Sequence, residues 1–177
     1  VAELRQERLA ESFRAAALDL PLVWAVRRDG TVCRFEIDTN KRYQVQQDGA
    51  VIETGAEGDD VVLMGRSLFL PRNGELHRFE IAQNNTLTRS GVFGTRGKRT
   101  TRGIVERGSD AFVIDSTRIV SFTGIGIGQT PSVASTLNGP EIWTGADAAG
   151  GFLYATCVWP EDESRGLVVF EIGADCS

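Results

Sequence analysis

Short apolar runs separated by glycine-containing turns fill the chain after Pro21. Three kinds of run recur in the same order, and strands of this length between turn residues are typical of all-β domains. The first kind ends in glycine, the second is apolar throughout, and the third follows a turn and alternates. The first kind covers 61–65, 103–108 and 141–145, the second 68–70, 111–114 and 152–155, and the third 79–81, 120–122 and 170–172. The segments 22–26 and 35–37 supply a partial fourth copy.

The spacing of the large apolar residues shows that these runs form an internal repeat. Two sets recur about every 43 residues: Trp24, Phe69, Phe112 and Leu153, and Phe35, Phe79, Phe122 and Phe170. The dipeptides Asp29-Gly30 and Asn73-Gly74 are strong hairpin signals. A period of this length, with three or four short strands in each unit, is typical of propeller blades. We therefore expect four β-meander units and favour a small β-propeller, closed or partial.

Two features leave the arrangement of the units open. Glu36, Glu80 and Glu171 alternate with apolar residues, so one face of the third strand is wetter than a propeller blade needs. A β-sandwich or barrel of repeated meanders is therefore the alternative. The second run is apolar on both faces, which predicts an inner, doubly buried strand. The termini cut across one unit, so a closed ring would join strands from both ends, and an open half-ring would need a second copy or another protein.

The segment before Pro21 has a different composition. Glu, Arg, Gln and Ala dominate residues 2–19, and Leu4, Leu9 and Phe13 fall near one stripe at helical spacing. Pro21 disfavours a helix at the residue before it. We expect a helix within residues 1–20 that packs on the domain or docks another subunit, followed by a repeat β domain at 21–177.

Composition narrows the class of protein. With 41% hydrophobic residues and 24% charged residues, the chain can bury a core. A net charge of −5 makes nucleic acid an unlikely partner. No apolar stretch reaches the ~18 residues of a membrane-spanning helix. No segment identifies a cellular compartment.

The residues that usually carry catalysis or bind metals are sparse. His77 is the single histidine, and its place in an alternating run predicts an ordinary strand residue. Cys33, Cys157 and Cys176 are odd in number and widely spaced, which favours free thiols in a reducing compartment over a disulfide framework or a zinc site. We therefore predict no catalytic residue, no metal and no cofactor.

A basic segment is the most unusual local feature. It includes Arg96, Lys98, Arg99 and Arg102 on an otherwise acidic chain. Such a segment can bind an acidic protein surface or another anion. Trp159, beside Pro160 on the long final hairpin, is the best candidate for an exposed aromatic contact. These five residues form the predicted partner-binding site.

The carboxylates decide between the functional hypotheses. Asp29, Asp60, Asp110 and Asp147 lie at roughly repeating positions before or between strands, where such residues usually make turns. The main hypothesis is a non-enzymatic protein-binding or scaffold module that presents its loops from a rigid domain. A structural subunit of a larger assembly is one alternative. A propeller-type hydrolase or lyase that uses clustered carboxylates is the other.

Overall fold

The computed structural model describes residues 13–19, 21–27, 29–38, 44–53, 60–95, 101–126, 128–139 and 142–173. Its strands form four antiparallel sheets, each a meander in which the strand order follows the chain. Sheet 1 contains β1 (Phe13–Asp19), β2 (Leu22–Arg27), β3 (Thr31–Asp38) and β4 (Gln44–Glu53). Sheet 2 contains β5 (Val62–Met64), β6 (Ser67–Arg72), β7 (Glu75–Ile81) and β8 (Leu87–Gly94).

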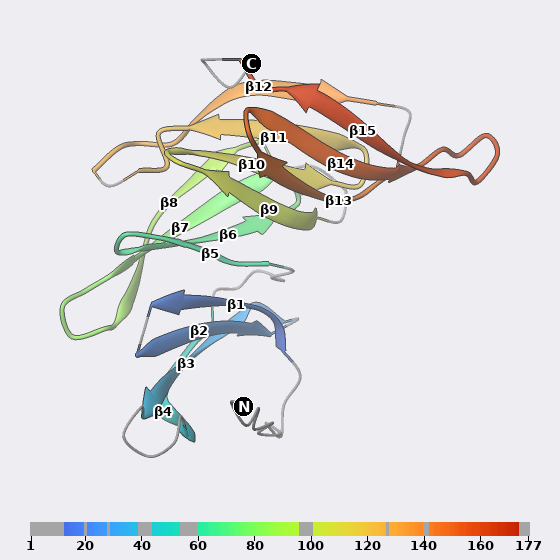
Figure 1. The fold of residues 1–177 in the computed structure, drawn as a ribbon. Coiled ribbons are helices and arrows are strands. Elements are labelled where there is room, and N and C mark those ends of the chain that lie inside the picture. Colours follow the sequence, from blue (N-terminus) through green and yellow to red (C-terminus); the bar gives the residue numbers. More distant parts are fainter. Residues whose placement is uncertain are drawn as a thin grey trace.

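Sheet 3 contains β9 (Thr101–Arg107), β10 (Asp110–Asp115), β11 (Arg118–Thr123) and β12 (Ser132–Asn138). Sheet 4 contains three strands, β13 (Ile142–Ala149), β14 (Phe152–Val158) and β15 (Arg165–Glu171). The sheets are stacked in chain order, from sheet 1 at the bottom of Figure 1 to sheet 4 at the top. The strands form four separate sheets, none of which closes on itself, instead of the two packed sheets of a β-sandwich or the closed sheet of a barrel, so both alternatives are wrong.

The predicted N-terminal helix is also wrong wherever the structure can test it. Residues 13–19 form β1, which pairs with β2 so that Ala17 lies opposite Trp24. Ala17 is buried while its neighbours Ala16 and Leu18 are exposed, which is the alternation of a strand. Alanine favours a helix by intrinsic propensity, but the edge of β2 supplies hydrogen-bond partners for a strand, and this tertiary pairing overrides the propensity. Residues 1–12 lie outside the described residues.

No helix that is long and apolar enough to span a membrane occurs in the described part of the chain.

The hairpin expected at Asn73-Gly74 is present, and both residues have positive φ angles, 48° and 82°. That conformation matches the tight turn between two twisted antiparallel strands.

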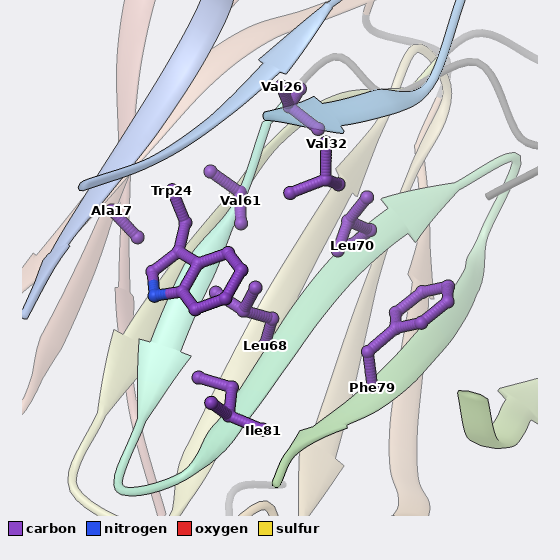
Figure 2. Close-up of a cluster of buried hydrophobic side chains, with 9 residues drawn as sticks. All are labelled: Ala17, Trp24, Val26, Val32, Val61, Leu68, Leu70, Phe79 and Ile81. Carbon is purple, nitrogen blue, oxygen red and sulfur yellow. The ribbon is translucent and has the colours of Figure 1, made fainter. Parts of the chain in front are cut away.

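The hydrophobic core consists mainly of three layers, each between consecutive sheets. Figure 2 shows the first layer, where Trp24 and Val32 of sheet 1 pack against Leu68 and Leu70 of sheet 2. Phe69, between those two leucines in β6, points the other way and packs in the second layer, against sheet 3. The third layer joins sheets 3 and 4 in the same manner. Its buried members include Phe112, Ile114, Ile119, Trp143, Leu153 and Cys157.

This layering corrects one detail of the sequence analysis. The runs 68–70 and 111–114 are buried on both faces, but they are the second strand of their sheets rather than the innermost. The innermost strands are β1, β5, β9 and β13, each of which pairs with a neighbour along one edge only.

The two-sided burial of β6 generates a stability prediction. Replacing Phe69, which is 0% exposed, with Ala should lower the free energy of unfolding by about 3–5 kcal/mol, because the second core layer loses a complete aromatic ring. Phe152→Ala is the matched control, because Phe152 is 39% exposed and should cost less than about 1 kcal/mol. Urea titration followed by tryptophan fluorescence measures both. Equal losses for the two variants would contradict the layered core.

Candidate functional site

The four innermost strands surround a hollow of about 390 Å³. Each of them contributes to its wall, with Leu18 from β1, Leu63 from β5, Glu106 from β9 and Asp147 from β13 among the lining residues. Because these strands pair on one side only, their other backbone edges are left without a strand partner. Along these edges the backbone N–H and C=O groups have no strand partner among the described residues, so a side chain or a ligand can bind them.

Asp60 shows what these inner edges can bind. Its Oδ2 accepts a hydrogen bond from the backbone N–H of Ile104 at 3.0 Å, and its Oδ1 accepts one from Val61 N–H at 2.8 Å. Gly103 leaves room for this contact, since a Cβ there would lie 3.2 Å from Asp60 Oδ2. The free edge of β9 thus already holds a carboxylate oxygen, and amides of this kind suit the oxygen of a polar ligand equally well.

Two acidic side chains line the hollow, Glu106 and Asp147. Both residues are solvent-exposed, and Asp147 Oδ1 accepts a hydrogen bond from Ala148 N–H at 2.8 Å. Every other described lining residue is an alanine, valine, leucine or isoleucine, so none of the described wall residues places a cation opposite the carboxylates. A water molecule or a hydroxyl group that enters the hollow therefore meets two proton acceptors, beside a wall whose exposed atoms are partly polar and partly apolar.

Metal binding has little support in the described part of the chain. No group of three or more His, Cys, Asp and Glu side chains in metal-binding proximity occurs there. Glu106 and Asp147 alone would leave a divalent cation dependent on water or ligand oxygens for most of its coordination.

His77 lies away from the hollow, on β7, and is 3% exposed. Its Nδ1 is 3.1 Å from the guanidinium of Arg89, and its Nε2 is 3.2 Å from Glu75 Oε2. Since a guanidinium can only donate, Nδ1 accepts, and Nε2 carries the proton and donates to Glu75. Burial lowers the pKa of His77; the hydrogen bond to Glu75 opposes this shift and the charge of Arg89 adds to it. We interpret this neutral imidazole as a structural link, as the sequence predicts.

Two arginines brace sheet 2 against sheet 3. Arg78 donates to the carbonyl oxygen of Gln129 at 2.7 Å and forms an ion pair with Glu80. Arg118 donates to the carbonyl oxygen of Thr95 at 3.0 Å and forms an ion pair with Asp115. Their hydrogen-bonding groups are directed at the protein itself, so we assign them to the fold.

The predicted partner-binding residues do not come together in the described residues. Arg102 is exposed at the beginning of β9, while Arg96, Lys98 and Arg99 lie outside the described residues. Trp159 is half-buried on the third core layer, and its ring covers Gly166 so closely that a Cβ there would meet it at 2.1 Å. The binding role of these five residues stays a prediction.

Two of the three cysteines lie among the described residues, and no disulfide joins these two. Cys33 is a buried free thiol, Cys157 is buried with its Sγ 3.8 Å from the carbonyl oxygen of Gly166, and Cys176 lies outside the described residues. Burial raises the pKa of Cys33, which keeps its thiol protonated and unreactive.

Sequence reasoning missed Glu106 and assigned Asp147 to a turn. The available signal for Glu106 was its position in the first run of its repeat, at 103–108, where a carboxylate follows apolar residues, whereas Asp147 lies just beyond the corresponding run at 141–145. That signal becomes meaningful only once the first run is known to be the innermost strand of its sheet.

The likeness to known proteins is confined to the fold. No family model matches the chain, and no curated protein sequence is significantly similar. A putative 6-phosphogluconolactonase from Bacteroides uniformis has a similar structure, with a TM-score of 0.72 and 16% identity over 90% of this chain and 52% of that chain. The periplasmic gluconolactonase of Pseudomonas aeruginosa is similar with a TM-score of 0.58 and 14% identity over 87% of this chain and 52% of that chain.

A third similar structure, the computationally designed Ika4 protein, has a TM-score of 0.65 and 13% identity, and the match covers 96% of both chains. These likenesses show a propeller-like fold, and the chain spans about half the length of the lactonases. Two of these structures are named as lactonases, which contradicts the main functional hypothesis, a non-enzymatic binding or scaffold module.

The state of His77 generates a prediction about pH. The unfolded chain, with a histidine pKa near ~6.5, takes up a proton before the folded chain does. The free energy of unfolding should therefore fall between pH 7.5 and pH 5.5. Asp29 and Asp162, whose pKa values lie below the ordinary carboxyl value, should contribute to this change only at lower pH.

His77→Gln should flatten the fall, because glutamine takes up no proton in this range. Urea midpoints of both proteins at the two pH values test this. A decline of the same size in both would show that His77 does not titrate as described.

Proposed function

We propose that this chain is the core of a hydrolase that opens an uncharged sugar lactone in the hollow between the innermost strands. The observation that carries the proposal is the placement of Glu106 and Asp147 beside free backbone edges in one cavity. The structural likeness to lactonases agrees with this reaction class. Because such a fold hosts many functions, the site residues carry the proposal and the likeness only supports it.

The carboxylates supply the general base for the reaction. One of them takes a proton from a water molecule as the water oxygen attacks the carbonyl carbon of the lactone. The carbonyl oxygen becomes an oxyanion, which inner-edge N–H groups stabilise as they already stabilise the carboxylate of Asp60. The ring C–O bond then breaks, and the leaving oxygen takes the proton back from the carboxyl group. Lactone and water become one hydroxy acid, with no cofactor needed.

The charge of the wall favours an uncharged substrate. Two carboxylates and no basic side chain face the hollow among the described lining residues, so a phosphate group would enter a negative field without a partner. The volume of about 390 Å³ falls in the range of small-molecule sites, roughly 300–1,000 Å³. A monosaccharide lactone, which is polar and neutral, suits both properties.

Removing either proton acceptor tests the proposal. Glu106→Gln and Asp147→Asn keep the size of the side chain and remove its basicity. We expect at least one of them to lower kcat for D-glucono-1,5-lactone by about 10²–10⁴-fold, the usual contribution of a general base. Acid release, measured in a pH-stat against a protein-free blank, follows the reaction.

Glu161→Gln is the matched control, because Glu161 is exposed in the final hairpin, away from the hollow. It should leave the rate unchanged, and the 6-phospho form of the lactone should be the poorer substrate. Hydrolysis no faster than the blank, or full activity in both hollow variants, would contradict the proposal.

A further inference from the structure

β15 has a partner strand on one side only. It corresponds in the repeat to β3, β7 and β11, which carry the same phenylalanine position, and each of those third strands pairs with a strand on both sides. Within the described residues, sheet 4 ends at β15, while the other sheets each have a fourth strand. β15 thus has the repeat position of an interior strand but lies at the edge of its sheet.

The hydrogen bonds at both ends of the β14–β15 hairpin show which groups are free. Trp159 N–H donates to Ser164 O at 2.9 Å, and Ile172 N–H donates to Gly151 O at 2.8 Å. Because hydrogen-bonded pairs alternate along an antiparallel ladder, the even-numbered residues of β15 bond to β14. The backbone groups of Leu167, Val169 and Glu171 therefore face the open edge.

A groove of about 260 Å³ lies along this edge. Ser135 and Leu137 of β12 form one wall, Phe170 and Ile172 form the other, and Ile119 lies between them. In Figure 1, β12 and β15 lie side by side at the top of the stack. The groove occupies the place in sheet 4 that β8 and β12 fill in sheets 2 and 3.

β15 lacks three features that usually protect an edge strand from further pairing. Proteins usually guard edge strands with proline, lysine or a β-bulge. β15 has no proline or lysine, and its pairing with β14 runs through seven consecutive residues without a register shift. The pairings of β4, β8 and β12 with their neighbours each contain a register shift. Leu167 and Val169 are also 58% and 49% exposed.

We propose that one extended segment of another polypeptide adds to β15 as the fourth strand of sheet 4 and fills this groove. β12 already lies beneath the vacant position, so the space admits a single strand and excludes the edge of a second packed sheet. The segment should carry apolar side chains at alternate positions, facing Leu137 and Phe170. The exposed Arg165 and Glu171, at opposite ends of the edge, should prefer an acidic and a basic residue as neighbours.

A peptide copied from residues 86–94, which include β8, is a suitable probe because it forms the fourth strand of sheet 2. Added to the ¹⁵N-labelled full chain, it should shift the amide signals of Leu167, Val169 and Glu171. Val169→Pro removes the outward N–H without touching the bonds to β14, and should weaken binding at least tenfold. Val169→Thr, which keeps the N–H, should bind as well as the native chain.

A second pair of variants leaves the backbone of β15 intact. Leu137→Glu places a charge on the groove wall and should also weaken binding at least tenfold. Val133→Glu, on the opposite face of β12 and similarly exposed, should not. Three results would overturn the proposal: no shifts at millimolar peptide, shifts equally strong with a scrambled peptide, or binding that survives both Val169→Pro and Leu137→Glu. This test measures peptide binding and not lactonase activity, so its result is independent of the proposed function.

Discussion

The burial of apolar side chains between consecutive sheets is the interaction on which the rest of this structure depends. β6 shows it most clearly, because Leu68 and Leu70 complete the layer toward sheet 1 while Phe69 completes the layer toward sheet 3. A sheet with two apolar faces is stable only between two others, so the meanders stack. The stacking also fixes which strand of each sheet lies innermost.

The candidate site is a consequence of that stacking. Four innermost strands that pair on one side bring four unpaired backbone edges around one hollow. Asp60 shows that such an edge binds a carboxylate oxygen, and Glu106 and Asp147 supply proton acceptors beside it. A second edge of this kind lies in sheet 4. Among the described residues β15 pairs only with β14, and a groove lies next to its other edge. Both places lie beside strand edges that have no strand partner among the described residues, but only the groove at β15 has a largely apolar wall.

The sequence predicts the local parts of this structure well. The repeat, the hairpin at Asn73-Gly74 and the two-sided burial of 68–70 all follow from spacing and residue type. The strand at Phe13–Asp19 does not, because its alanines favour a helix and only the pairing with β2 overrides that preference. Glu106 is recognisable as a site residue only after the stack is known, since its exposure to the hollow depends on four strands distant in sequence.

A titration of the ¹⁵N-labelled chain with D-glucono-1,5-lactam tests the central claim most directly. This stable analogue keeps the ring and carbonyl of the lactone but resists hydrolysis. If the inner edges form the binding site, the amide signals of Leu63, Glu106 and Ala146 should shift together and saturate, while those of the outer strands stay in place. An unchanged spectrum, or shifts confined to the outer strands, would contradict the account.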